Sequence, residues 1–287
     1  KRKLDGNDDL MLIDVREDKE LEVCKINQAI HIPMGTVPKR LNDIDSNIAS
    51  FQSGADIINS DDLPEDDDGH GSHVAGIIGN EKNGTGLHGI AYEADLHIIR
   101  VLDDDGSGTF AQIASGMNKA RGISGIDIAN LSLGDSGVIG TTCNTAATCE
   151  TSLGSTLYTA LENLGSAGVI AVWAAGNDGY ASPSVSAGSA IYDDDFKETT
   201  VIVVGIGADG LLSTTGYTSN YCGTAAAICI AAPSGGNGKY LYSNFSSNAQ
   251  STYGVNSYAR GAWGTSMAAP MVSGGLALIK QEFSSLS

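Results

Sequence analysis

One serine in the chain has the setting that a nucleophile needs. Ser266 stands between Thr265 and an apolar, helix-patterned run in GTSMAAPMVSGGLALI (264–279). At a helix N-terminus, backbone N–H groups and the helix dipole would favour a developing oxyanion. Pro270 costs little near the helix start, because the first amides of a helix lack intrahelical partners. Ser266 is therefore a candidate nucleophile.

Two histidines precede a second helical pattern, DDDGHGSHVAGII (66–78). The spacing of His70 and His73 lets one imidazole face a cleft while the other packs inward. A serine hydroxyl needs a neighbouring base, and histidine is the side chain that titrates near neutrality. A cation site built from HxxH and three aspartates is the alternative. It lacks the HExxH glutamate and a further ligand at fixed spacing, so the pattern favours a general base.

An asparagine completes the set in VIAVWAAGNDG (169–179). After an apolar strand, Gly176 and Asn177 bring a side-chain amide to the strand's carboxyl end. That amide could donate a hydrogen bond to an oxyanion opposite Ser266. Taken alone, an asparagine after a strand is ordinary turn chemistry.

Alternating apolar and amphipathic segments predict the elements that position these residues. Buried strands are expected at 96–102, 126–133, 169–175, 200–206 and 225–232, and helices at 109–122 and 151–168. Strand and helix in repetition predict an α/β fold with a doubly wound, mostly parallel sheet and helices on both faces, a three-layer arrangement. Its site should lie at the carboxyl ends of the strands.

Composition restricts the partners and the compartment. With 16 Lys and Arg against 34 Asp and Glu, the net charge of −18 argues against nucleic acid as a partner. No apolar run reaches the roughly 18 residues that a membrane helix needs, and no signal peptide opens the chain, so a mature or excised fragment is expected. Cys143 with Cys149 and Cys222 with Cys229 could form two short-range disulfides in an oxidising compartment, leaving Cys24 odd; four reduced, buried thiols are the alternative.

Four motifs, HGSHVAGIIG, LSLG, AAGN and GTSMAAP, occur in the order that subtilisin-like serine peptidases show. The resemblance covers about residues 51–283. It implies Ser266 as nucleophile, His70 as general base, and Asn177 as oxyanion donor beside the Ser266 amide. It also implies two backbone segments that clamp an extended peptide. They are Gly106, Ser107 and Gly108, and Ser132, Leu133 and Gly134.

The same resemblance implies a calcium loop and a secreted protein. In GNEKNGTGLHG (79–89), Asn83 and the carbonyls of Glu81, Thr85 and Leu87 could coordinate a structural Ca²⁺, and no cofactor is needed for the chemistry. The segment SNYCGTAAAICIAAP resembles secreted bacterial members, which favours the disulfides and an extracellular, monomeric protein. The acidic clusters 66–68, 103–105 and 193–195 are expected to be solvated loops.

The amino end departs from the family pattern. The family's third catalytic residue, an aspartate ending the first core strand, has no matching motif; His31 falls near its place, and Asp45 is too close to His70. Asp14, at the end of LMLID, is the remaining candidate. Its surroundings, however, resemble the first half of a rhodanese-like domain, whose cysteine loop is absent. We therefore expect a rhodanese-like segment or atypical amino end at 1–45, and a peptidase domain at 46–287 that is short at its carboxyl end.

These features predict a serine endopeptidase that cleaves extended polypeptides through an acyl-enzyme. The alternative is a catalytically impaired relative that binds peptide, because loss of the orienting aspartate in such a triad costs on the order of 10⁴ in turnover while leaving the fold intact. A rhodanese-like interaction module is a third hypothesis, and it accounts only for the first forty or so residues.

Overall fold

The computed structural model describes residues 12–14, 29–31, 51–82, 87–246, 249 and 259–283. Contacts divide the chain into two units, Lys1–Asn47 and Ile48–Ser287. In the first unit, strands β1 (Leu12–Asp14) and β2 (Ala29–His31) pair in parallel, with Asp14 opposite His31. The short strands expected from LMLIDV and QAIHIP are therefore present.

A four-stranded parallel sheet forms the centre of the second unit, in the order β5-β6-β7-β8. Its strands are β5 (Ile128–Leu131), β6 (Ile170–Ala174), β7 (Thr200–Ile206) and β8 (Cys229–Pro233). The strong β-formers Val and Ile dominate β7, and both faces of β6 and β7 are largely buried, as the continuous apolar runs predict. The first three strands lie within the expected ranges, whereas β8 begins four residues later than expected because residues 225–228 belong to a 3₁₀ helix.

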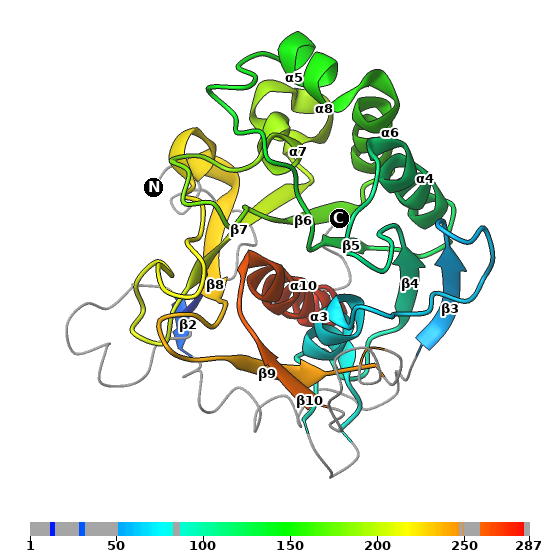
Figure 1. Ribbon diagram of the computed structural model, residues 1–287, viewed down its shortest axis with the longest axis vertical. Coiled ribbons are helices and arrows are strands. Elements are labelled where there is room, and N and C mark those ends of the chain that lie inside the picture. The colour runs from blue at the N-terminus through cyan, green and yellow to red at the C-terminus, as the bar shows by residue number, and fades with distance from the viewer. Residues whose placement is uncertain are drawn as a thin grey trace. The chain divides into compact units, whose positions relative to one another are not determined.

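A second parallel pair, β3 (Phe51–Asp56) and β4 (Leu96–Arg100), lies beyond β5. Figure 1 shows β4 between β3 and β5. Among the described residues, β4 and β5 share no ladder hydrogen bonds, so the parallel arrangement is interrupted between them. Their half-buried side chains contrast with the buried residues of β6.

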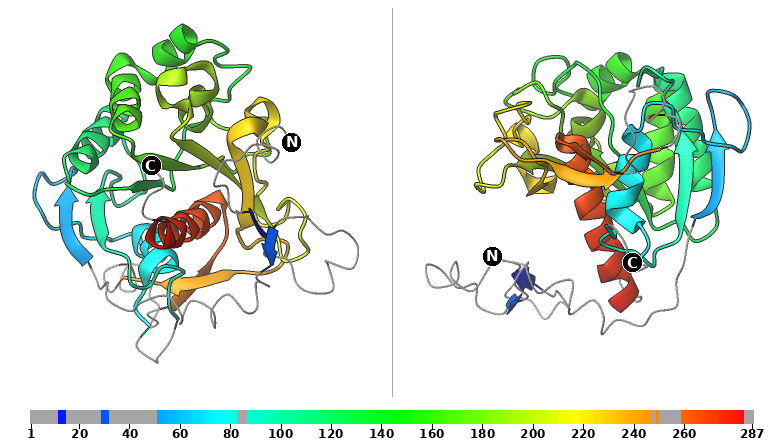
Figure 2. Two further views of the ribbon diagram at one scale, coloured as in Figure 1. Left: turned by 180° about the vertical axis from the view of Figure 1, so that it is seen from behind. Right: turned by 60° about the horizontal axis from the view of Figure 1, so that its bottom comes forward.

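Helices cover both faces of the sheet, which gives three layers (Figures 1 and 2). Helix α10 (Thr265–Glu282) packs against all four strands β5 to β8 and beside α3 (His70–Gly79). On the opposite face, α4 (Phe110–Arg121) packs against α6 (Ser155–Ser166), which contacts β6. The shorter helices are α5 (Ala146–Leu153), α7 (Val185–Gly188) and α8 (Asp194–Lys197), with single 3₁₀ turns η3 (Ser189–Tyr192) and η4 (Gly223–Ile228).

The core lies on both sides of the sheet because successive strand residues point to opposite faces. Val172 and Ala174 of β6 pack with Ala268 and Ala269 of α10. Trp173, between them in sequence, is buried in the larger cluster that α4 and α6 share. The expected doubly wound α/β architecture is confirmed.

An antiparallel ribbon of β9 (Leu241–Asn244) and β10 (Ala259–Ala262) runs into α10. Helix α3 packs closely on β9, and a Cβ at Gly76 would come within 2.4 Å of Ser243 Oγ. The close approach explains why a glycine stands in the middle of this helix.

Both expected disulfides are formed, Cys143–Cys149 and Cys222–Cys229. The alternative of four reduced thiols is therefore wrong. Cys24 lies outside the described residues.

Candidate active site

Ser266 occupies the first turn of α10, as the sequence predicts. Pro270 lies one turn further along than expected, where its missing N–H would leave the Ser266 carbonyl without its helical partner. The Ser132 hydroxyl fills that role and donates to the Ser266 carbonyl at 2.7 Å. Because of the proline, the Ser266 carbonyl is available for this bond, which links the nucleophile's backbone to the end of β5.

The Ser266 hydroxyl is half-buried and makes only a long contact of 3.4 Å with the Ser132 carbonyl. The Ser266 amide, at the helix start, has no hydrogen-bond partner among the described residues. Both groups are thus free for a substrate carbonyl. Behind them, Ser273 donates to Asn130, and the Asn130 amide donates to Ser132, which ties α10 to β5.

Asn177 follows β6 and is held by the residue before the nucleophile. Its Oδ1 accepts from the Thr265 amide and from the Thr265 hydroxyl, each at 2.9 Å. Because Oδ1 is fixed from two directions, the exposed Nδ2 group is oriented and free to donate. The amide expected to stabilise an oxyanion is thereby joined to the helix that carries Ser266.

The turn that presents Asn177 depends on a buried asparagine, Asn220. Its Oδ1 accepts from the amides of Asp178 and Tyr180 at 3.1 and 2.9 Å, and its Nδ2 donates to the Ala175 carbonyl at 3.0 Å. Gly176 has a φ of 109°, and a Cβ there would come within 2.3 Å of Asn220 Nδ2. Only glycine fits this backbone conformation at this distance.

The two histidines separate as the spacing predicts. His73 is buried, and its Nε2 lies 3.2 and 3.0 Å from the carbonyls of Leu241 and Arg260. Carbonyls only accept, so Nε2 carries the proton, while Nδ1 is buried without a partner. Burial lowers the pKa of His73, which keeps it a neutral structural residue.

His70 is the first residue of α3 and half-buried. Among the described residues, no hydrogen bond joins its ring to another group. Burial lowers its pKa, and the carboxylates of Asp68 and Asp66 raise it partway back. A neutral imidazole with free ring nitrogens is the state in which histidine accepts a proton.

The loops with the expected peptide-binding segments leave backbone groups available. Residues 106–108 are exposed, and Ser132, Leu133 and Gly134 directly follow β5. The amides and carbonyls of Gly108, Leu133 and Gly134 have no partner among the described residues. Such groups can pair with an added strand.

The residues expected to hold calcium are only partly described. Asn83 and Thr85 lie outside the described residues. The Leu87 carbonyl accepts a hydrogen bond from the Asn80 side-chain amide, and the Asn80 carbonyl accepts from the Gly89 amide at 2.8 Å, which closes the base of the loop. No group of three or more His, Cys, Asp or Glu side chains suited to a metal occurs in the described ranges, and Glu81 belongs to none.

Sequence reasoning missed three residues that support the site: Thr265, Asn220 and Arg100. Thr265 is adjacent to the nucleophile, but nothing in its type announces a bond to Asn177, 88 residues away. Arg100 ends β4 and forms an ion pair with the buried Asp56. An apolar strand ending in an arginine is a weak sequence signal for such a pair.

Comparisons with known proteins agree with this arrangement. The model of the subtilase family, Peptidase_S8, matches residues 34–287. Subtilisin Savinase of Lederbergia lenta is 33% identical over 233 residues, which cover 81% of this chain and 71% of that protein. An alkaline protease of Alkalihalobacillus alcalophilus is also 33% identical over 233 residues, but the chain spans only half of its length.

Among solved structures, Sphericase matches with a TM-score of 0.62 and 26% identity, over 83% of this chain and 73% of that one. No helix of the described residues is long and apolar enough to cross a membrane. The four sequence motifs, the geometry at the start of α10 and these matches agree, and the chain belongs to the subtilase family of serine endopeptidases.

Proposed function

We propose that this serine endopeptidase cleaves extended polypeptides with Ser266 as nucleophile, His70 as general base and Asn177 as oxyanion donor. The proposal rests on one observation: the amide and the hydroxyl of Thr265 both donate to Asn177 Oδ1. Thr265 directly precedes Ser266, whose amide has no partner among the described residues. The bonds from Thr265 hold Asn177 beside the N-terminus of α10, where negative charge is favoured, which supports the proposal that its amide and the Ser266 amide bind the same oxyanion.

The reaction follows from these positions. Ser266 Oγ attacks the substrate carbonyl carbon while His70 takes the hydroxyl proton, and the oxyanion accepts from Asn177 Nδ2 and the Ser266 amide. The C–N bond then breaks, and His70 returns the proton to the leaving amine. Water attacks the acyl-enzyme with His70 again as base, which releases the carboxylic acid and restores Ser266.

Substrate binding is assigned to two segments that can add an extended peptide as a strand. They are Gly106, Ser107 and Gly108, and Ser132, Leu133 and Gly134. The unpaired backbone groups of Gly108, Leu133 and Gly134 support the assignment. We infer that recognition rests mainly on main-chain hydrogen bonds, which suits unfolded polypeptide.

From the sequence alone, we propose that Asp14, the last residue of β1, is the carboxylate that orients His70. Arg100 at the end of β4 lies 3.9 Å from Asp67, three residues before His70, and Ser132 after β5 bonds to Ser266. An orienting carboxylate would therefore need to reach the carboxyl ends of β4 and β5. Asp56 is the competing candidate, since it is buried at a strand end, but its oxygens already accept from Ile58, Asn59 and Arg100.

The test uses a fluorophosphonate probe, which labels an activated serine. The parent chain should be labelled, Ser266→Ala should not, and Ser155→Ala, which alters another exposed serine at a helix start, should behave like the parent. Asp14→Asn should retain the fold and lower the labelling rate and peptide turnover by about 10⁴ if Asp14 orients His70. Unchanged rates would reject that assignment, and an unlabelled parent would favour the impaired peptide-binding protein.

We further propose one structural Ca²⁺ in the loop 79–89, held by Asn83 and by the carbonyls of Glu81, Thr85 and Leu87. The closed loop base at Asn80 and Gly89 supports it, although the Leu87 carbonyl must exchange its bond to Asn80 for the ion. In Ser266→Ala protein, which cannot digest itself, Ca²⁺ should raise the Tm relative to EDTA. An equal gain in Asn83→Ala would exclude this site.

An extracellular location and a monomeric state are proposed on similar grounds. Two disulfides form most readily in an oxidising compartment. For residues 1–45 the rhodanese-like likeness rests on its sequence motif alone. Light scattering of the purified chain would test the monomer, since a dimer doubles the mass.

A further inference from the structure

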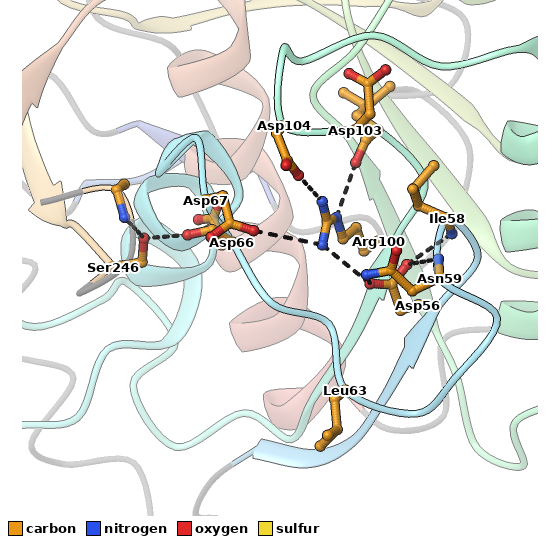
Figure 3. A network of polar contacts seen from close by, with 12 residues as sticks. Asp56, Ile58, Asn59, Leu63, Asp66, Asp67, Arg100, Asp103, Asp104 and Ser246 are labelled. Atoms are coloured by element: carbon orange, nitrogen blue, oxygen red, sulfur yellow. Dashed lines mark hydrogen bonds and ion pairs between the residues drawn. The ribbon is translucent and has the colours of Figure 1, made fainter. Parts of the chain in front are cut away.

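Arg100, at the end of β4, contacts the loop that directly follows it and two carboxylates, Asp56 and Asp67, that precede it by more than thirty residues (Figure 3). Its Nη1 lies 3.2 Å from Asp56 and 3.9 Å from Asp67, and its Nη2 is hydrogen-bonded to Asp104. Its Nε donates to the Leu102 carbonyl at 3.2 Å. The Arg100 side chain is only 10% exposed and that of Asp56 is fully buried, so their ion pair is screened less by solvent than a surface pair, whereas Asp104 is largely exposed.

Asp56 fixes the guanidinium in place. Its side chain is fully buried, and it also accepts from the amides of Ile58 and Asn59 at 2.7 and 2.9 Å. A buried carboxylate with this many partners is rigid, and loss of its cation would leave an uncompensated charge. Arg100 is therefore oriented from the side of β3, and its remaining donors point to the two loops.

One of these loops leads to the general base. Asp66 accepts from the Ser72 amide at 2.6 Å, and Asp68 accepts from the His70 amide at 3.1 Å, so their carboxylates bind the first turn of α3. Asp67, between them, faces the guanidinium instead. This pattern differs from the expected solvated acidic loop: two carboxylates order the helix start, and the third ties it to the sheet.

The other loop carries the first peptide-binding segment. Leu102 and Asp104, both bound to Arg100, open the turn in which the Asp103 amide donates to the Ser107 carbonyl at 2.8 Å. The Ser107 amide in turn donates to the Asp103 carboxylate at 2.9 Å. Arg100 adds to these two bonds by holding Leu102 and Asp104, the residues through which the chain enters and continues the turn.

We propose that Arg100 is a positioning residue that sets His70 through Asp67 and the peptide-binding segment 106–108 through Asp104. The inference rests on the proposed function of His70 and of that segment. We call the contact between Arg100 and Asp67 the Asp67 arm, and the contact between Arg100 and Asp104 the Asp104 arm. The Asp67 arm acts on the chemical step, and the Asp104 arm acts on substrate binding.

Two alanine variants separate the arms on an extended fluorogenic peptide. Asp67→Ala should lower kcat about ten-fold with KM unchanged, because a displaced base slows proton transfer without loss of substrate contacts. Asp104→Ala should raise KM about three- to ten-fold with kcat unchanged, because it loosens contacts made equally in the ground and transition states. Asp194→Ala, which removes an exposed carboxylate from an ion pair with Lys197, is the matched control and should match the parent.

Arg100→Lys tests the centre of the arrangement. Lysine keeps a cation beside the buried Asp56 but cannot donate along three directions as a guanidinium does. The variant should therefore combine the lower kcat with the higher KM. Parent values of kcat and KM in all three variants would overturn the proposal, as would equal changes of both constants in Asp67→Ala and Asp104→Ala.

A readout without turnover keeps this test separate from the proposed function. By hydrogen exchange, Asp67→Ala should deprotect the Ser72 and His70 amides only, and Asp104→Ala the Ser107 amide only. If the fluorophosphonate probe fails to label the parent, the proposed function is wrong, and the exchange data still decide the role of Arg100. Exchange that is unchanged, or raised in both loops by either variant, would reject it.

Discussion

Asn177 is the residue whose contribution can be isolated most cleanly. Its Oδ1 accepts two hydrogen bonds from Thr265, which leaves Nδ2 as the donor, and under the proposed function truncation removes a donor that is needed only when the oxyanion forms. Asn177→Ala should lower kcat by about 10² to 10³ with little change in KM. Steady-state kinetics on a peptide amide would measure this, with Asn118→Ala on the exposed face of α4 as control. A rise in KM at constant kcat would assign Asn177 to substrate binding instead.

Under the proposed function, the pH dependence of activity is set by His70. Its pKa lies below the usual value for a histidine because burial outweighs the carboxylates of Asp68 and Asp66. His70 must be neutral to accept a proton, so kcat/KM has its full value above this pKa and falls as the pH drops through it. Asp68→Asn removes the larger of the two raising charges, so the acid limb of kcat/KM should move to lower pH. An acid limb of Asp68→Asn that stays in place or moves to higher pH would contradict this cause. Asp194→Asn is the control and should keep the parent's pH profile.

At this scale the sequence was informative about residue types and silent about their partners. The settings of Ser266, His70 and Asn177 were readable, because a helix start and a strand end can be recognised locally. The sequence did not predict the hydrogen bonds of Thr265 to Asn177, or those of Asn220 to the turn that presents Asn177. Hydrogen bonds between distant segments leave no local pattern in a sequence.

Among the elements, the two disulfides offer a matched pair. They close loops of nearly equal length, with sequence separations of 6 and 7, so the chain-entropy contribution is about 2.5 kcal/mol for each. Cys143 and Cys149 are buried in the main cluster, whereas Cys222 and Cys229 are only partly buried. Replacing the buried pair by serines also leaves two hydroxyls in an apolar environment, which costs about 1–3 kcal/mol for each unsatisfied group.

Cys143→Ser with Cys149→Ser should therefore lower the free energy of unfolding more than Cys222→Ser with Cys229→Ser. Urea unfolding in a Ser266→Ala background, which prevents self-digestion, would measure both. Equal losses would show that burial adds nothing to the constraint on the unfolded chain.

Periodicity predicted the types of the main elements, but it did not predict how Pro270 is accommodated in its helix. Its helix is where the apolar pattern predicts it, but the proline lies in the second turn, where a carbonyl is left without a partner. The Ser132 hydroxyl at the end of β5 satisfies that carbonyl. Only the packing of α10 on the sheet could reveal this compensation.

For the whole molecule, the net charge of −18 is the dominant long-range term. Mutual repulsion opposes compaction, while exposed ion pairs such as Lys280–Asp127 at 3.4 Å stabilise little. The Debye length falls from about 30 Å at 0.01 M salt to about 8 Å at 0.15 M. The Tm of Ser266→Ala protein should therefore rise with NaCl over this range, whereas a sucrose series of equal osmolality serves as control. A falling Tm would mean that attractive pairs outweigh the repulsion.

The sequence by itself predicted the α/β class, the alternation of the main strands and helices and the three residues proposed for the chemistry, and it offered both disulfide pairings with reduced thiols as the alternative. These properties are written in local periodicity, in short motifs and in cysteines a few residues apart. The tertiary structure decided that β4 and β5 share no ladder among the described residues, that Thr265 orients Asn177, and that Arg100 holds the loops of His70 and of residues 106–108. The bond between Thr265 and Asn177 and the contact between Arg100 and Asp67 join segments tens of residues apart, and the contact between Arg100 and Asp104 depends on a side-chain orientation that Asp56 fixes, so each exists only once the chain has packed.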